Sequence, residues 1–570
     1  MIDKIWQYRN EKLKREDIEE VSRTLHIPPI FATILMNREI PRADMHSFLQ
    51  KSMQSVINPM LMTDMDKAVE RIKTAVSNKE KIIIYGDYDV DGITSTALLY
   101  DFLISVGADA DYYIPERQGE GYGINIMAVN KLIKQGFKLL ITVDCGITAI
   151  GEVEFAVLQG MDVIITDHHT CKDRLPTAAK AIINPKRDDE YPFKELAGVG
   201  VAFKLVLALA MAFEVDTNEC FRRYIDLAAI GTVADVVPLT DENRIIVDRG
   251  VKTLRKSPRI GVKALLDRAK VNSNSMTAGS IAFSIAPRLN ASGRLGNAET
   301  SVKLLLSTNE EEAKQIAMEL DNQNRERQIT EQNIFDEAME MIASDPNFEK
   351  KKVIVLAHED WHHGVIGIVA SRICERFYKP CILISHSNGI GKGSGRSIES
   401  FNLFDALSEC EDELTQFGGH KIAAGLTINI SDLEKFTAKI NRYADEMLTE
   451  GDMIPKVKID CRISERAVTL ENAKALSRLE PFGVGNEKPV FSLDEAEIIQ
   501  ITAVGNENKH LRIVIAKGGK QMNCIGFYMG EYSKELRPGD VISVAFQMDI
   551  NNFQGNYNVQ LLLKDIKKCK

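Results

Sequence analysis

The strongest constraint on the fold is the stretch 81–99, KIIIYGDYDVDGITSTALL, in which a short apolar run ends in three closely spaced acids. The run 82–85, IIIY, is typical of a strand that is buried in a parallel sheet. Asp87, Asp89 and Asp91 follow at alternate positions, and alternate side chains of an extended backbone project to the same side. Because converging negative charges repel one another, this pattern favours a cation bound among the carboxylates.

Three further segments place acids or histidines where a predicted element ends. They are KLLITVDCG with Asp144, DVIITDHH with Asp167, His168 and His169, and IDLAAIGTVADVVPL with Asp235. α/β sheets bind their ligands at the carboxyl ends of the strands. A solvated acidic turn is an adequate explanation for one isolated DxD pair, but four such segments predict a shared metal site.

The order of predicted elements indicates an α/β protein with several domains. Strands and helices alternate from residue 58 to 239, which predicts a doubly wound, mostly parallel sheet. Helical spacing continues to 343 and includes a long exposed connecting helix. A second α/β unit begins near residue 352, and short strands separated by turns then predict a β-barrel. The predicted domains are N-terminal helices at 1–55, the first α/β domain at 56–240, a helical connector at 241–345, the second α/β domain at 346–452 and the barrel at 453–570.

Composition narrows the functional classes. The formal net charge of −10 argues against a surface that is basic throughout, as in many nucleic-acid-binding proteins, but it is compatible with a local basic channel. No run of about eighteen apolar residues predicts a membrane span, and the N-terminus lacks the apolar region of a signal peptide. The nine cysteines include no CxxC pair, so neither a disulfide framework nor a structural zinc site is indicated. A cytoplasmic location is therefore expected.

Two kinds of loop have the chemistry of phosphate binding. PRLNASGRLG at 287–296 carries Arg288, Asn290 and Arg294, and arginine is suited to bidentate phosphate contacts. The alternative for this loop is a cap between helices. GKGSGRS, with Ser394 and Arg396, and GGHKIAAG, with His420, are glycine-rich segments whose backbone amides could cradle an anion.

These motifs, in this order, carry a family resemblance. GDYDVDG, VDCG, TDHH and GTVADVVPL resemble the four motifs of the DHH phosphoesterase superfamily. With APRLNASGRLG, WHHGVIGIVASR and the two glycine-rich loops, the chain from about residue 58 onward is similar to the RecJ family of single-strand-specific exonucleases. The resemblance implies a DHH domain, a DHHA1 domain and an OB-fold. It also implies hydrolysis of single-stranded DNA from the 5′ end to mononucleotides in recombination and repair, beside a single-strand-binding protein and a helicase.

The resemblance also implies a two-metal site. Oxygen-rich sites with imidazole suit Mn²⁺, with Mg²⁺ as the alternative. The implied ligands are Asp89, His168 and Asp235 for one ion, Asp87 for the other, and Asp144 as the best candidate to bridge them. Many superfamily members have a histidine before the first acid of the first motif, where this chain has Tyr85 and Gly86.

The remaining residues of the motifs are expected to act beside the metals. Asp167 is expected to orient a histidine or a water molecule, and His169 to transfer a proton or stabilise the transition state. Asp91 precedes a glycine and is expected to cap a turn.

The resemblance further implies which residues contact the DNA. Arg117, in YYIPERQGEGYGI, would lie near the substrate phosphate, although a solvated arginine in a surface turn is the alternative. Ser394, Arg396 and His420 would hold the 5′ end and the adjacent backbone. Aromatic residues of the barrel could stack bases or belong to its core, and the candidates are Phe527, Tyr528, Phe553 and Tyr557, beside His510 and Arg512.

Two other functions compete with this interpretation. One is a DHH-family phosphoesterase that acts on short oligonucleotides or small phosphate esters, against which the length and the predicted barrel count. The other is a non-catalytic single-strand-binding protein, against which the clustered acids and histidine count.

Overall fold

The computed structural model describes residues 4–9, 12–116, 121, 123–187, 190–256, 258–553 and 555–569. The chain divides into two compact units. The first unit comprises Ser47–Arg327 and Leu479–Glu487, and the second unit comprises Met1–His46, Gln328–Arg478 and Lys488–Lys570. Among the described residues, no helix has the length and apolar character needed to cross a membrane.

The first unit is built on a five-stranded parallel sheet with the order β3-β2-β4-β5-β6. Its strands are β2 (Ile82–Tyr85), β3 (Ala110–Tyr113), β4 (Leu139–Val143), β5 (Asp162–Thr166) and β6 (Ala181–Ile183). The chain continues from β2 to β3 on one side and then crosses to β4 on the other. Such a reversal of strand order leaves a crevice at the carboxyl ends of the strands, where α/β sheets bind their ligands.

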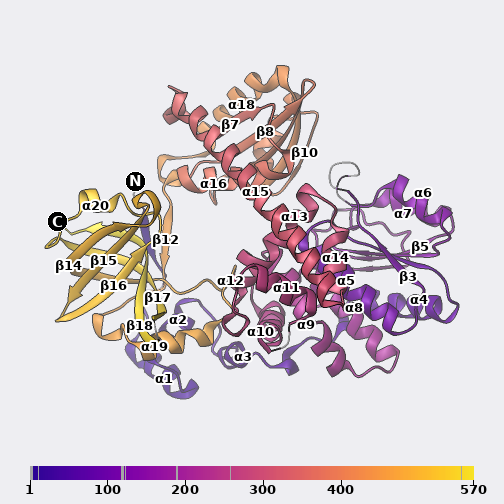
Figure 1. Cartoon of the computed structure of the whole chain (residues 1–570), viewed down its shortest axis with the longest axis horizontal. Helices are drawn as coiled ribbons and strands as arrows, with labels where there is room; N and C mark the ends of the chain where they lie inside the picture. Colours follow the sequence, from indigo (N-terminus) through magenta and orange to yellow (C-terminus); the bar gives the residue numbers. More distant parts are fainter. Residues whose placement is uncertain are drawn as a thin grey trace. The chain divides into compact units, whose positions relative to one another are not determined.

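Both faces of this sheet are covered by helices (Figure 1). Ile82 and Ile84 of β2 belong to one apolar core, whereas Ile83 and Tyr85 belong to the other. The first core is completed by α4 (Met65–Ser77), α5 (Val90–Ser105), α8 (Gly198–Ala212) and α9 (Thr217–Ala234), and the second by α6 (Ile126–Lys134) and α7 (Ile150–Leu158). The predicted doubly wound sheet is thus confirmed.

Helices also form the connection that follows the sheet. They are α10 (Asp241–Lys256), α11 (Ile260–Arg268), α12 (Ala278–Ser280), α13 (Ala286–Leu295), α14 (Glu299–Leu306) and α15 (Glu310–Ser344). α15 has 35 residues and is the long helix that the sequence predicts. It belongs to the first unit up to Arg327 and to the second unit from Gln328.

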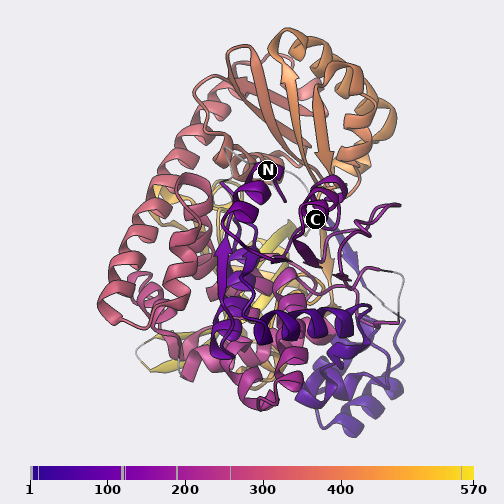
Figure 2. The same ribbon diagram turned by 90° about the vertical axis from the view of Figure 1, so that its right-hand side faces the viewer.

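The second unit contains a mixed five-stranded sheet with the order β10-β11-β9-β8-β7. Its strands are β7 (Ile354–His358), β8 (Cys381–Ser387), β9 (Ile390–Arg396), β10 (Gln416–Gly419) and β11 (Ala423–Asn429). Only β7 and β8 pair in parallel. The accompanying helices are α16 (His363–Phe377), α17 (Leu403–Ser408) and α18 (Leu433–Met447), and Figure 2 shows helices beside both faces of this sheet.

The C-terminal part of the second unit is a closed barrel. β14 (Phe491–Val504), β15 (His510–Lys517), β16 (Lys520–Gly526), β18 (Asn556–Lys568) and β17 (Val541–Phe553) pair in this order, and β17 pairs back to β14. The short β13 (Cys461–Arg462) pairs beside β14, and α19 (Leu470–Leu476) and α20 (Tyr532–Glu535) accompany the barrel. The predicted β-barrel is confirmed.

The N-terminal segment is helical in α1 (Arg15–Leu25), α2 (Pro29–Asn37) and α3 (Met45–Gln50), as expected, but it begins with a strand. β1 (Ile5–Tyr8) pairs in parallel with β12 (Lys456–Ile459), and the indole of Trp6 donates a hydrogen bond to Asp565 (2.7 Å). The expectation of helices alone was wrong here because β12, the partner of this four-residue strand, is remote in the sequence.

Candidate active site

Three strands of the first unit end side by side, and each is followed by acids or histidines. The register pairs Tyr85 of β2 with Thr142 of β4, and Val143 of β4 with Thr166 of β5. The three strands therefore end at nearly the same level. The chain leaves β4 through Asp144, whose left-handed backbone (φ 61°) turns the chain sharply at the end of the strand.

Two helices bring the remaining groups to this edge. Asp235 is the C-cap residue of α9. α8 begins at Gly198, where an added Cβ would lie 2.5 Å from Oδ1 of Asp144. Glycine at this position therefore lets the N-terminus of α8 approach the carboxylate.

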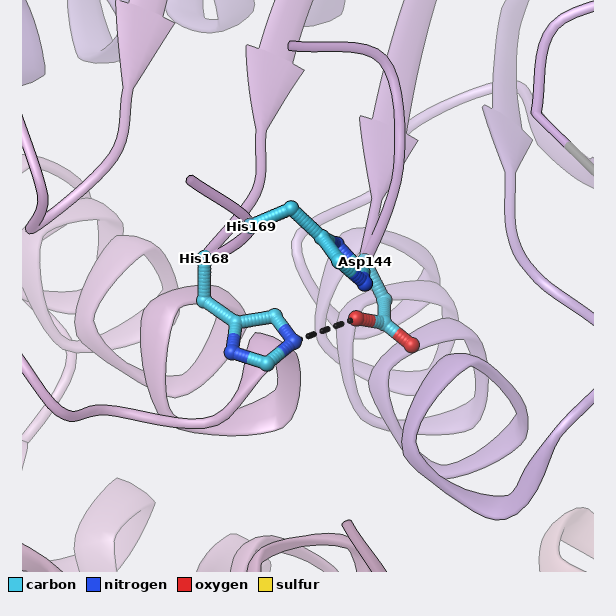
Figure 3. Close-up of side chains that lie close together, drawn as sticks. All are labelled: Asp144, His168 and His169. Carbon is cyan, nitrogen blue, oxygen red and sulfur yellow. Dashed lines mark ion pairs between the residues drawn. The ribbon is translucent and has the colours of Figure 1, made fainter. Parts of the chain in front are cut away.

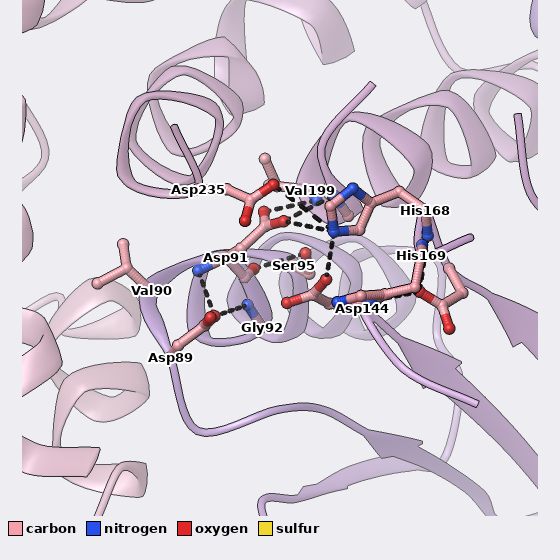
Figure 4. Close-up of polar contacts among 12 residues, drawn as sticks. Asp89, Val90, Asp91, Gly92, Ser95, Asp144, His168, His169, Val199 and Asp235 are labelled. Carbon is pink, nitrogen blue, oxygen red and sulfur yellow. Dashed lines mark hydrogen bonds and ion pairs between the residues drawn. The ribbon is translucent and has the colours of Figure 1, made fainter. Parts of the chain in front are cut away.

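The side chains form three groups, and within each group the ligand atoms lie within 4.8 Å of one another. The groups are Asp87 with Asp89 and Asp144, Asp91 with His168 and Asp235, and Asp144 with His168 and His169. The third group shares one residue with each of the other two. Nε2 of His168 lies 3.2 Å from Asp144, 3.6 Å from Asp235 and 3.9 Å from Asp91 (Figures 3 and 4). All five residues predicted as ligands thus lie in one cluster.

Asp91 and Asp89 lie differently from what the resemblance implied. Asp91, which was expected only to cap a turn, lies with His168 and Asp235. Asp89, which was expected in that group, is the N-cap of α5 and accepts hydrogen bonds from the amides of Asp91 and Gly92 (2.9 and 3.1 Å, Figure 4). Asp89 therefore groups with the other two carboxylates and caps α5 at the same time.

Asp91 was predicted to lie among the converging carboxylates but was not included among the expected metal ligands. Its carboxylate is 1% exposed and accepts hydrogen bonds from the amides of Gly198 (2.6 Å) and Val199 (2.8 Å) at the N-terminus of α8. A helix N-terminus stabilises negative charge. The sequence contains a pattern that could have identified Asp91 as a ligand, because Asp91 continues the alternate spacing of Asp87 and Asp89.

Burial and repulsion raise the proton affinity of these carboxylates. Burial, helped by Asp89, raises the pKa of Asp91 to about 7. Burial, helped by Asp91, raises the pKa of Asp235 to about 9 and that of Asp144 well above its ordinary value. Among the described residues, Oδ2 of Asp235 is buried without a hydrogen-bond partner. An oxygen-rich, negatively charged cluster with one imidazole fits Mn²⁺ or Mg²⁺.

The two histidines have opposite electrostatic surroundings. Burial, helped by the charge of His169, lowers the pKa of His168 to about 3, so its imidazole is neutral and able to ligate a cation. Burial alone would also lower the pKa of His169, but the hydrogen bond between its Nδ1 and Asp167 (2.7 Å) raises it. The same bond lowers the pKa of Asp167 against the effect of burial.

The carboxylate of Asp167 accepts hydrogen bonds from several groups around the two histidines. Its Oδ1 also accepts from the amides of His168 (2.7 Å) and His169 (3.0 Å), and its Oδ2 accepts from the amide of Ile147 (2.9 Å). The side-chain amide of Asn184 donates to the carbonyl of His169 (3.0 Å). Asp167 therefore lies where it can orient His169, as expected.

The segment predicted as a phosphate-binding loop, 287–296, is instead the helix α13 up to Leu295, with Gly296 as its C-cap. Asn290 accepts a hydrogen bond from the amide of Val90 (3.2 Å) at the start of α5. Arg288 pairs with the buried Asp321 of α15 (3.0 Å), and Arg294 is half-buried. Within the first unit, Asn290 thus supports the first motif, and Arg288 connects α13 to α15.

In the second unit, the predicted anion-binding residues lie on the sheet. Ser394 and Arg396 are on β9, two positions apart, and the guanidinium of Arg396 donates to Oγ of Ser394 (3.2 Å). β9 pairs with β11, which pairs with β10, and His420 follows β10 as an exposed side chain. Arg117 lies outside the residues that the structure describes.

The barrel presents several of its aromatic side chains to solvent. Phe527, Tyr528 and Tyr557 are 59%, 81% and 55% exposed. The ring of His510 lies 5.4 Å from that of Phe527 and 5.2 Å from that of Tyr528. The side chain of Phe553 lies outside what the structure describes. The three described aromatics are therefore surface groups rather than core.

Comparisons with known proteins agree with this architecture. The family model described as the DHH family, N-terminal domain, matches residues 81–232. The DHHA1 domain model matches residues 350–446, and the RecJ OB domain model matches residues 459–565.

Similar proteins have been described in bacteria. The single-stranded-DNA-specific exonuclease RecJ of Bacillus subtilis is 41% identical over 97% of this chain and 69% of its own length. The protein of the same name from Escherichia coli is 35% identical over 97% and 99%. Crystal structures of RecJ from Thermus thermophilus with Mn²⁺ and with Mg²⁺ have TM-scores of 0.86 and 0.80 and identities of 30% and 29%. Each covers 99% of this chain, and the matches extend over 80% and 79% of those chains.

The raised carboxylate pKa values predict that cation binding depends on pH. Binding requires the deprotonated carboxylates, and those of Asp91 and Asp235 have pKa values of about 7 and about 9. The apparent Mn²⁺ affinity should therefore rise from pH 6 to 9, by up to about tenfold per pH unit for each proton displaced. Calorimetric titration in two buffers of different ionisation enthalpy measures the protons released. An affinity that is independent of pH, with no proton release, would contradict these pKa shifts.

The position of Asp91 predicts that its charge contributes to cation binding. Asp91→Asn keeps an oxygen that can accept from the N-terminus of α8, and it should weaken Mn²⁺ binding by at least about tenfold because one negative charge is lost. The matched control is Asp216→Asn at the opposite end of α9, where asparagine caps a helix as well as aspartate. Equal Mn²⁺ affinities of both variants and the wild type would show that Asp91 only caps a turn.

Proposed function

The chain belongs to the RecJ family of single-stranded-DNA-specific exonucleases, and from this we propose how its residues carry out the reaction. It is a metal-dependent hydrolase that digests single-stranded DNA, with Mn²⁺ or Mg²⁺ as the cofactor. The observation that carries the mechanism is the cluster of buried carboxylates and histidines at the carboxyl ends of β2, β4 and β5. Neither alternative, an enzyme for small phosphate esters or a non-catalytic binding protein, is favoured.

The direction and setting of the reaction are part of this proposal. Digestion proceeds from the 5′ end and releases mononucleotides in recombination and repair. A helicase that opens the duplex and a single-strand-binding protein are the expected partners, and the cytoplasm is the expected location. These statements rest on the family resemblance.

Two adjacent sets of ligands would hold two ions. Asp87, Asp89 and Asp144 form one set, and Asp91, His168 and Asp235 form the other, with Asp144 beside His168 of the second. Ions bound there supply Lewis-acid polarisation of the phosphate and lower the pKa of water. The protein contributes a fixed arrangement of carboxylates, a neutral His168 and the N-terminus of α8 behind Asp91.

His169 is the proposed proton donor. Hydrolysis forms a new phosphorus–oxygen bond from water, which loses one proton to the solvent, and breaks the bond from phosphorus to the 3′ oxygen of the terminal nucleotide, which must gain one proton. Asp167 raises the pKa of His169 and holds its Nδ1. A side chain that is 39% exposed can still reach the substrate. The raised pKa favours the protonated form of His169, and its exposure gives it access, which supports this proposed role.

The second unit is proposed to hold the 5′ end of the DNA. Ser394, Arg396 and His420 offer a hydroxyl, a guanidinium and an imidazole on neighbouring segments of one sheet. Arg117 and Arg294 are proposed to contact the backbone near the reacting phosphate, and Arg288 and Asn290 to support the loop around the first motif. The exposed aromatics of the barrel are proposed to stack bases.

Digestion of end-labelled oligonucleotides tests the proposed function. A single-stranded oligonucleotide with a 5′ label should release labelled mononucleotide early with Mn²⁺ or Mg²⁺, and a 3′ label should be released late. The same label on a duplex, or in the presence of a chelator, should remain in place. Early release of the 3′ label would overturn the direction. Cleavage confined to very short oligonucleotides would favour the small-substrate phosphoesterase.

Removing Arg396 should affect the substrate more than the metal. Arg396→Ala should raise the KM for a 5′-phosphorylated oligonucleotide by about tenfold or more, because a charge-assisted contact is lost, and it should leave Mn²⁺ affinity unchanged. Arg442→Ala, at an exposed arginine of α18, is the matched control. A loss of Mn²⁺ binding in Arg396→Ala would show that β9 has a different role.

A further inference from the structure

A loop far from the metal ligands in the sequence packs against the segment that follows Asp235. The clasp loop, Leu479–Glu487, lies between α19 and β14 but belongs to the first unit. The carbonyl of Val484 accepts a hydrogen bond from the amide of Leu239 (2.7 Å). The clasp loop therefore contacts the chain four residues beyond a proposed ligand.

The segment between Asp235 and Leu239 begins with a strained, exposed residue and ends in the apolar core. Val236 has a left-handed backbone (φ 62°), which is costly for a β-branched residue, and its side chain is 64% exposed. Beyond it, the buried amide of Asn243 donates to the carbonyl of Pro238 (3.0 Å). Pro238 is thus bonded to Asn243, and Leu239, which belongs to the apolar core of the first unit, is bonded to the clasp loop.

The clasp loop approaches these residues closely because it carries glycines. A Cβ added at Gly483 would lie 2.7 Å from Cδ1 of Leu239, which is 3% exposed. A Cβ at Gly485 would lie 3.2 Å from that of Pro238, and the backbone there is left-handed (φ 72°). The contact therefore leaves no room for larger side chains at Gly483.

Internal hydrogen bonds and one lysine keep the clasp loop closed. Gly483 and Asn486 exchange backbone hydrogen bonds (both 3.1 Å), and the fully buried side-chain amide of Asn486 donates to the carbonyls of Leu479 (2.8 Å) and Pro481 (2.7 Å). Nζ of Lys51 donates to the carbonyl of Glu480 (2.7 Å). The loop is thus a rigid surface rather than a flexible linker.

We propose that the clasp loop is a positioning element for Asp235, acting through Pro238 and Leu239. Metal sites tolerate displacements of only a few tenths of an ångström in their ligands, and groups that orient ligands commonly change metal affinity by about 10- to 100-fold. The inference rests on the proposed function only in taking Asp235 as a metal ligand. Asn486 is the side chain that closes the loop, so its removal is the most direct perturbation.

Mn²⁺ titration of the full-length chain tests the clasp loop. Asn486→Ala should weaken Mn²⁺ binding by about tenfold, and the lost nuclease activity should return at high Mn²⁺. Asn441→Ala is the matched control, because the amide of Asn441 also donates to two carbonyls, those of Val353 (3.1 Å) and Thr437 (3.0 Å), within the second unit. A fall in Tm in both variants with unchanged Mn²⁺ affinity in Asn486→Ala would show that the clasp loop contributes only to the stability of the fold. That result would overturn the proposal.

A second pair of variants keeps the test decisive if Asn486→Ala fails to fold. Gly483→Ala should weaken Mn²⁺ binding because its methyl group displaces Leu239, and the double variant with Leu239→Val should recover affinity because the clash is relieved. Failure of the second substitution to restore affinity would contradict the proposed path. Mn²⁺ affinity requires no substrate, so these outcomes are independent of whether the wild type digests DNA from the 5′ end.

Discussion

Mutual repulsion among buried carboxylates is the constraint on which the first unit depends. Two like charges 4 Å apart repel by about 4 kcal/mol at an effective dielectric constant of 20, and the cluster gathers five acids. The N-terminus of α8 offsets part of this cost at Asp91 through two amides. Oδ2 of Asp235 has no such hydrogen bond among the described residues. The fold therefore holds these groups in an arrangement in which either protons or bound cations must offset the repulsion, and this links metal binding directly to the shape of the site.

The neighbouring histidines show how one environment supports two kinds of chemistry. His168 is buried beside other positive charge, so its neutral form is favoured and it can ligate a cation. His169 is held by Asp167, so its protonated form is favoured and it can give up a proton. Pairs of titratable groups whose pKa values are driven apart are typical of acid–base sites. The two rings lie only 4.5 Å apart, and their pKa values differ because His168 is more buried and His169 bonds to Asp167 and faces further carboxylates.

The sequence predicted the sheet and the cluster because both depend on local patterns. Apolar runs that end in acids identify buried parallel strands, and parallel strands bring their carboxyl ends together. Which carboxylates group with which other ligands could not be predicted from local patterns. Asp89 and Asp91 both lie at the start of α5, and which of them contacts His168 depends on where α8 begins, at Gly198. Similarly, the strand Ile5–Tyr8 could not be recognised without β12.

The contacts that hold the cluster in place come from segments that no motif marks as catalytic. Asn290 of α13 caps the start of α5, and Val484 of the clasp loop holds the chain beyond Asp235. Metal-ligand geometry has a narrower tolerance than fold geometry. Residues of this kind can therefore affect the reaction as well as the stability of the fold. A motif identifies the atoms that bind the cation, whereas the precision of their arrangement depends on packing between segments that are remote in the sequence.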